Sequence, residues 1–500
     1  NRAKLTAVSD MNKYRTGPLA TNKMPPGIPY IIGNEAAERF SFYGMRSVLL
    51  AYMTVYLANP DGTLAVLPEK EAEVWVHFFV GSAYFFPIIG GILSDAFFGK
   101  YRIIISLSMT YCLGHLCLAF MGVMGNTREW LFVGLLFIAI GSGGIKPCVS
   151  AHVGDQFCKK NGRFLSRVFG WFYFSINFGA FASGLLTPFL LEGRNVAGTI
   201  GGQVYPWVEF LVGEKAQEEI LFGPHYAFGL PGLLMALATF VFWLGRNRFA
   251  HVPPMGVSYF REVFSGGNLK SIGRLSIIFS FFIIFWSLFD QLGTSWQIQA
   301  RSLDRMIPDW IPVLGGYELL AAQVAAVFNP LFILLLIPVF NFGVYPLIER
   351  FFPLNPLRKI SIGLFVMTLA FSIVAFVQVA VDNGETPHMG WQVLACLLLT
   401  SAEVMISITG LEFSYTQAPK AMKSFVLSLF LLTVSFGNFF TSGVKLFILN
   451  EDGSSKLPGA SEFWFWTGLI GLAAVLFVFV AKSYKAKTYL QDEEVDPTDA

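Results

Sequence analysis

The chain has 500 residues, of which 54% are hydrophobic and 14% are charged, with a formal net charge of +2. Soluble domains carry about 25% charged residues, so this composition excludes an ordinary soluble protein. The small net charge and the short basic clusters also argue against a nucleic-acid partner. The sequence therefore predicts a membrane protein whose apolar side chains face lipid.

Twelve segments are long and apolar enough to cross a membrane as helices, which requires roughly 20 residues each. A polar stretch separates the first six segments from the second six. We therefore expect an all-α polytopic protein with twelve transmembrane helices in two six-helix bundles. The approximate segments are 34–57, 74–95, 102–124, 130–151, 165–191, 226–245, 273–297, 319–342, 358–381, 389–410, 423–447 and 461–483.

Lys and Arg residues predict the orientation of the chain, because cytoplasmic loops carry an excess of them. If the N-terminus is cytoplasmic, the cytoplasmic segments hold most of the 35 Lys and Arg residues. We therefore predict a multi-pass plasma-membrane protein with both termini in the cytoplasm. The predicted divisions are a cytoplasmic tail at 1–25, a first bundle at 26–247, a cytoplasmic linker at 248–271, a second bundle at 272–487 and a cytoplasmic tail at 488–500.

The first predicted span carries four charged residues on one face. In a helix, Glu35, Glu38, Arg39 and Arg46 fall within an arc of about 100°. Charges at membrane depth are costly unless they pair or line a cavity, so we interpret this face as lining a cavity. The alternative for Glu35 is a solvated helix end, whereas Arg46 lies too deep in the span for that.

Isolated charges also occur in three later spans. Lys146 follows a Gly-rich run in the fourth span, Asp290 lies in the seventh and Glu403 in the tenth. The alternative for Lys146 is snorkelling toward the membrane surface. Together with the first span, these residues give four acids and three bases. Because burial favours the protonated form of the excess acid, the set offers a physical route to proton coupling.

Histidine and cysteine residues are the remaining candidates for chemistry. His77 opens the second span and could accept an external proton, because imidazole titrates near neutral pH. The alternative for His77 is a hydrogen-bonded residue at the membrane interface, and His115 is interpreted as structural. The five cysteines form no CxxC pair, so we expect buried thiols rather than a disulfide framework or a zinc site.

Four segments together resemble the proton-coupled oligopeptide transporter family, a branch of the major facilitator superfamily. In chain order they are 35–44 (EAAERFSFYG), 90–100 (GGILSDAFFGK), 172–179 (FYFSINFG) and 403–419 (EVMISITGLEFSYTQAP). The resemblance covers nearly all of the predicted membrane-spanning chain. It implies the major facilitator fold and a proton-coupled symporter that imports di- and tripeptides by alternating access. The short loops are similar to those of bacterial members, which implies a bacterial inner membrane.

The resemblance also implies roles for individual residues. Arg46 and Lys146 would hold the peptide carboxylate, and Glu403 would meet the amino terminus. Arg46 with Asp290, and Lys146 with Glu35, would form gating or coupling ion pairs. Together with the charge pattern, the predicted proton-coupling residues are Glu35, Glu38, Arg39, His77 and Asp290. The predicted substrate-binding residues are Tyr43, Arg46, Tyr84, Lys146, Asn177, Trp286, Asn329 and Glu403, with Trp286 as a candidate for an apolar wall.

The sequence departs from the family pattern at three places. Phe42 stands where the family often has a tyrosine, so one pocket hydroxyl is absent. Ala180 replaces a common serine, which we interpret as a packing difference. The stretch 247–272 is too polar and too short for the two additional helices that many bacterial relatives carry between the halves.

Three alternatives to peptide transport remain open. A transporter of another anion, such as nitrate, is the nearest, although such relatives tend to lose the ExxER signature that is intact here. A membrane enzyme would need a nucleophile or metal cluster, and no HExxH or GxSxG motif occurs inside a span. A receptor fits twelve spans in two halves less well than a transporter does. We expect no catalytic residue, cofactor or metal, and a monomer whose partners are peptides, protons and the lipid bilayer.

Overall fold

The computed structural model describes residues 14–123, 126–199, 223–264, 266–312, 314–417 and 423–484. The predicted C-terminal tail and the first half of the predicted N-terminal tail lie outside the described residues, as do Ala418 and Pro419 of the fourth motif. Within the described residues the chain is almost entirely helical, with four isolated β-bridges and no β-strand.

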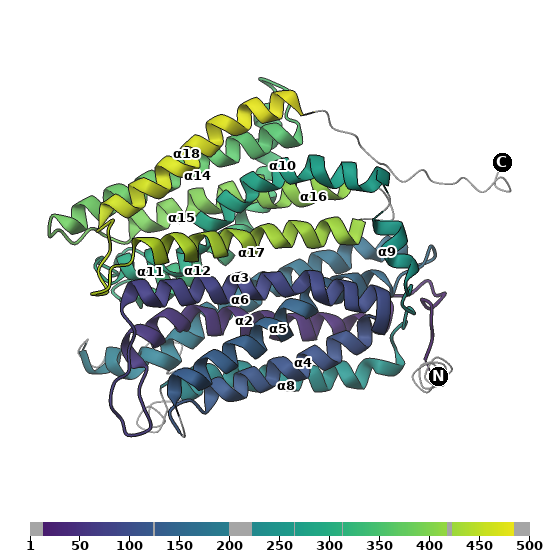
Figure 1. Ribbon diagram of the computed structural model, residues 1–500, viewed down its shortest axis with the longest axis horizontal. Helices are drawn as coiled ribbons and strands as arrows, with labels where there is room; N and C mark the ends of the chain where they lie inside the picture. The colour runs from purple at the N-terminus through teal and green to yellow at the C-terminus, as the bar shows by residue number, and fades with distance from the viewer. Residues whose placement is uncertain are drawn as a thin grey trace.

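The helices form two groups that lie side by side (Figure 1). The first half of the chain, purple to teal, makes the lower group, and the second half, teal to yellow, makes the upper group. The long helices of the first half are α2 (Ile28–Ala51), α3 (Glu69–Ile92), α4 (Lys100–Ala119), α5 (Thr127–Gly154), α6 (Leu165–Thr199) and α8 (Pro224–Leu244).

The second half contains several helices that are interrupted along their length. In the list that follows, η denotes a short 3-10 or π segment. The elements are α10 (Gly266–Phe289), η6 (Asp290–Gly293), α11 (Ser295–Ala300), α12 (Ala321–Val339), η7 (Phe340–Val344), α13 (Tyr345–Glu349), α14 (Pro356–Asp382), α15 (Gly390–Glu403), η8 (Val404–Ile408), α16 (Thr409–Thr416), α17 (Lys423–Ile448) and α18 (Ala460–Ser483).

Eleven helices in the described part of the chain are long and apolar enough to cross a membrane. The twelfth crossing is α2, which is 24 residues long. It is less apolar than the others because it carries the four charged residues Glu35, Glu38, Arg39 and Arg46. It packs along both α6 and α8 inside the first group. The predicted all-α fold with two groups of six crossings is therefore confirmed for the described residues.

The connection between the halves contains one short helix, α9 (Ser258–Val263), instead of two membrane-spanning helices. The Met255 backbone N–H donates to the Asp95 carbonyl at 2.7 Å, which fixes the connection to the end of the second crossing. Tyr259 of α9 shares a small apolar cluster with Phe425 of α17. The connection therefore contacts both halves at the right-hand end of Figure 1.

Glycines bring α3 and α5 into close contact. A side chain at Gly90 would collide with the backbone of Gly144, and one at Gly143 would collide with the backbone of Ala83. Small residues permit this approach between membrane helices. The contact fixes the position of Lys146, which lies within α5 two residues after Gly144, relative to the side chains of α3.

Candidate functional site: a charged cavity shared by both halves

A cavity of about 720 Å³ is lined by residues from both halves of the chain. Tyr173, which the sequence analysis did not select although it belongs to the third motif, also lines this cavity. Four predicted residues do not line it: Glu35, Glu38, His77 and Lys146. The predicted residues that do line it are Arg39, Tyr43, Arg46, Tyr84, Asn177, Trp286, Asp290, Asn329 and Glu403.

The acids of the first motif lie behind the cavity wall, where they hold Arg39. The Arg39 Nε atom lies 2.7 Å from Glu35 Oε1 and 3.3 Å from Glu38 Oε2. Both carboxylates are buried, with 1% of each residue exposed. The i, i+4 spacing on α2 produces the Arg39 contact with Glu35. A solvated helix end, the alternative for Glu35, does not fit this burial.

Lys146 also lies behind the wall, on the α5 side of α2. Its Nζ donates to Ser142 Oγ at 2.6 Å, and Ser142 in turn donates to Glu38 Oε1 at 2.7 Å. The ammonium lies 3.9 Å from Glu38 and 3.8 Å from the centre of the Phe42 ring. The Lys146–Glu35 pair implied by the resemblance is therefore not formed, because Glu35 is held by Arg39. Snorkelling to the membrane surface does not fit either, since the ammonium is enclosed by these groups.

A chain of contacts joins the two halves beside the cavity. Arg46 of α2 lies 2.5 Å from Asp290, the first residue of η6, so the implied Arg46–Asp290 pair is present. Asn438 of α17 donates to the other Asp290 oxygen at 2.6 Å. His77 of α3 contacts Asn438 Oδ1 through Nδ1 and Thr294 Oγ1 through Nε2, both at 2.9 Å. His77 is fully buried, and both of its ring nitrogens have hydrogen-bond partners from the second half.

The second-half wall of the cavity is acidic. Glu403 is the last residue of α15, where the helix changes into η8. Its carboxylate accepts a hydrogen bond from Asn329 Nδ2 at 2.8 Å, and the same amide lies 3.0 Å from Thr400 Oγ1. Helix irregularities of this kind are frequent at functional sites. Among the described residues, no Lys or Arg side chain forms an ion pair with Glu403, so its carboxylate can pair with a cationic group of a ligand.

The cavity therefore presents guanidinium groups on one wall and carboxylates on the other. Arg39 and Arg46 come from α2, whereas Asp290 and Glu403 come from the second half. Such a cavity can hold a small zwitterion across its width. Among the described residues, no group of three or more His, Cys, Asp or Glu side chains could hold a metal ion.

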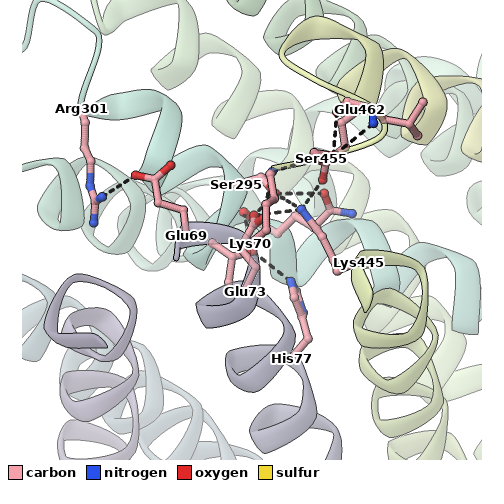
Figure 2. Close-up of polar contacts among 12 residues, drawn as sticks. Glu69, Lys70, Glu73, His77, Ser295, Arg301, Lys445, Ser455 and Glu462 are labelled. Atoms are coloured by element: carbon pink, nitrogen blue, oxygen red, sulfur yellow. Dashed lines mark hydrogen bonds and ion pairs between the residues drawn. The ribbon is translucent and has the colours of Figure 1, made fainter. Parts of the chain in front are cut away.

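The structure adds a charged cluster that the sequence analysis did not predict (Figure 2). Lys70 and Glu73 of α3 meet Lys445 of α17 and Glu462 of α18. We call these four residues the quartet. Two signals could have pointed to it: Lys445 lies alone in an apolar span, and Glu73 precedes His77 by one helical turn.

A family model described as PTR2, POT family, matches residues 101–266 and 265–458 of the chain. Peptide transporter family 1 of Drosophila melanogaster is 32% identical over 396 residues, which cover 72% of this chain and 48% of that protein. Solute carrier family 15 member 2 of Homo sapiens is 31% identical over 432 residues, which cover 78% of this chain and 54% of that protein. The chain spans about half the length of the curated relatives it matches.

Solved structures match almost end to end. The crystal structure of an auto-inhibited POT family peptide transporter has a TM-score of 0.75 and 32% identity, and the match covers 94% of this chain and 99% of that chain. The POT family transporter PepTSo has a TM-score of 0.76 and 33% identity, with 92% of this chain and 99% of that chain covered. The arrangement of helices around the cavity is thus shared with these proteins.

Proposed function

Because the chain belongs to the POT family, we propose that it is a symporter that imports di- and tripeptides together with protons by alternating access. The observation that carries this proposal is the cavity with guanidinium groups on one wall and carboxylates on the other. A short peptide is a zwitterion whose two ends need opposite partners. Its side chains would fall against Trp286 and the aromatic rings nearby, and apolar walls of this kind discriminate weakly between substrates.

We propose that Arg46 makes the main contact with the peptide carboxylate, and that Glu403 with Asn329 receives the amino group. Arg46 faces the cavity, whereas the Lys146 ammonium is covered by the Phe42 ring. Lys146 would reach the carboxylate only after that ring moves. Until then it acts on the cavity indirectly, through Ser142 and Glu38.

Proton coupling follows from the competition for Arg46. The peptide carboxylate and Asp290 need the same guanidinium, so binding of one weakens the hold of the other. Asn438 must direct its Nδ2 at Asp290, which leaves its Oδ1 to accept from His77 Nδ1. A proton on the other ring nitrogen would make His77 a cation one amide away from Asp290. The positive charge on His77 would then help to neutralise Asp290, so Arg46 would no longer be the only cation that does so.

The chain is a multi-pass membrane protein. We infer a bacterial inner membrane, cytoplasmic termini and a monomer, with bundles at 26–247 and 272–487 joined by the linker at 248–271. The Lys and Arg distribution supports this orientation. In it, the end of the molecule where α3 begins faces away from the cytoplasm.

The test is uptake of radiolabelled dialanine into proteoliposomes with an imposed inward proton gradient. We expect accumulation that disappears when a protonophore collapses the gradient, and that unlabelled dialanine blocks but nitrate does not. Empty liposomes and an Arg46→Ala variant are the controls. Absence of gradient-driven dialanine accumulation, together with gradient-driven uptake of labelled nitrate, would replace peptides with an anion as the substrate. Dialanine uptake that is independent of the proton gradient would contradict proton coupling.

A further inference from the structure

The quartet bridges the halves at the end where α3 begins, which is the left-hand end in Figure 1. Figure 2 shows these side chains converging from both halves, with His77 one turn further along α3. Glu73 and Lys445 are fully buried, and Glu462 is nearly so. Burying single charges is expensive unless each is paired and hydrogen-bonded. The arrangement therefore depends on its mutual contacts.

Two kinds of contact hold the quartet together. Across the halves, Lys445 lies 2.8 Å from Glu73, and Lys70 lies 2.7 Å from Glu462. Within each half, Lys70 lies 3.0 Å from Glu73, and Lys445 contacts Glu462. The hydroxyl of Ser295 adds a bond across the halves by donating to Glu73 at 2.6 Å. Each charged side chain thus has one partner in its own half and one partner in the other half.

This pattern decides what happens to the charges when the halves separate. Lys70 and Glu73 leave together on α3, and Lys445 and Glu462 stay together on α17 and α18. Each half then carries one cation and one anion, so no side chain is left as a lone charge. Among the described residues, the other charged or titratable groups labelled beside the quartet in Figure 2 are the Glu69–Arg301 pair and the buried His77, and neither forms an ion pair with the quartet.

We propose that the quartet is a latch that holds this end of the cavity closed and opens by dividing into two neutral ion pairs. Opening breaks the two contacts across the halves and the Ser295 bond, and it keeps the two contacts within the halves. The latch therefore needs no proton and no ligand to balance its charges when it opens. Because three contacts must break before the halves separate, the latch favours the closed arrangement in the protein without substrate.

The decisive variant exchanges charges across the halves, Glu73→Lys with Lys445→Glu. The closed arrangement remains neutral and keeps opposite charges across the halves, although the two contacts within the halves become like-charged. Separation, however, would leave two lysines on α3 and two glutamates on α17 and α18. We expect this variant to stay closed. A second variant, Lys70→Gln with Glu73→Gln, should have the opposite effect. It removes one neutral pair and leaves the Lys445–Glu462 pair intact, so we expect the halves to separate more readily.

The readout is the distance between spin labels at Glu129→Cys on α5 and Ser461→Cys on α18, measured by double electron–electron resonance in lipid nanodiscs. The five native cysteines are first replaced by serine. We expect the long-distance population to fall below that of the parent in the exchange variant and to rise about tenfold in the double-glutamine variant. The control is Glu69→Arg with Arg301→Glu, an exposed pair that also crosses the halves at 2.7 Å, and it should match the parent.

Equal distance distributions in the parent, the exchange variant and the double-glutamine variant would overturn the latch. If the exchange variant does not give a monodisperse protein, the double-glutamine variant decides alone, and an unchanged distribution there has the same meaning. The role of the latch in transport rests on the proposed function, whereas its opening and closing do not. Because the distances are measured without substrate, they remain interpretable even if dialanine proves not to be transported.

Discussion

Two buried ion-pair regions, the quartet and the Arg46–Asp290 pair, bridge the halves in the described part of the chain, and they differ in the charges that remain on each half after separation. The quartet divides into two neutral pairs, one in each half. The Arg46–Asp290 pair instead divides into a lone guanidinium on α2 and a lone carboxylate on η6. Both residues line the cavity, where a ligand or a proton can reach them. This comparison supports our proposal that coupling belongs to the Arg46–Asp290 pair, which cannot balance its own charges after separation.

This difference also explains why the two regions lie at different depths. The quartet is placed beyond His77, away from the cavity, where no substrate contact is needed. Asp290 is placed at a break between α10 and α11, where it faces Arg46, Asn438 and the cavity. A self-balanced contact can be buried completely, whereas a contact that must exchange partners needs an open face.

The largest effect is expected from breaking the cavity pair on one side. Arg46→Ala leaves Asp290 without its cation, a loss worth about 3–5 kcal/mol for a buried pair. We expect proton-driven dialanine uptake to fall more than about 100-fold. Adding Asp290→Asn should restore thermal stability but not uptake. Recovered uptake in the double variant would show that Arg46 serves only to neutralise Asp290, and the comparison would fail.

The next largest effect extends the comparison to the acids around Arg39. Glu38→Gln keeps the shape of the side chain, so the Ser142 contact can persist while the negative charge is lost. We expect gradient-driven uptake to fall at least about tenfold, while exchange of labelled for unlabelled dialanine without a gradient remains partly intact. Glu35→Gln should behave in the same way. Equal loss of both modes would leave these acids with no special part in coupling.

A moderate effect is expected from an unbalanced quartet. Lys445→Met leaves two glutamates with one lysine, and we expect a loss of about 3 kcal/mol of stability, seen as a lower melting temperature in detergent. Adding Glu462→Gln leaves the neutral Lys70–Glu73 pair and should recover most of this loss. No recovery would mean that packing of the lysine stem, and not charge balance, dominates the region.

The smallest effect is expected at the exposed bridge between the halves. Glu69 and Arg301 are 2.7 Å apart, but their side chains are 46% and 29% exposed. Solvent-exposed pairs contribute about 0.2–1 kcal/mol. Glu69→Gln should therefore change melting temperature and uptake very little. A loss as large as that of Lys445→Met would show that burial is not what separates the two classes of contact.

Hydropathy and charge position carried most of the information about the fold and the cavity. The crossings were predicted from the length and apolar character of the segments. The charged residues that share one face of α2 indicated a cavity. The POT family resemblance drawn from the four motifs is likewise confirmed. Asp290, Arg46 and Glu403 could be predicted as cavity candidates because isolated charges in apolar spans need a polar surrounding.

The family resemblance implied the Arg46–Asp290 pair, which is present. The partners of the other buried charges between helices could not be predicted, because they depend on tertiary contacts that sequence spacing does not encode. Lys146 meets Glu38 through Ser142, a bridge that requires the exact approach of α5 to α2. Lys70 and Glu73 read as a polar helix start, although α17 and α18 bury them. Asn438 connects His77 to Asp290 from a helix whose sequence gives no sign of either.

The glycine contact between α3 and α5 makes these two helices a single lever. With backbone against backbone at Gly90 and Gly144, there is no layer of side chains that could absorb a relative shift. A tilt of α3 that pulls Glu73 away from Lys445 must therefore carry α5 with it. The far arm of that lever bears Ser142 and Lys146, which hold Glu38. Events at one face of the membrane would thus be delivered mechanically to the charges behind the cavity.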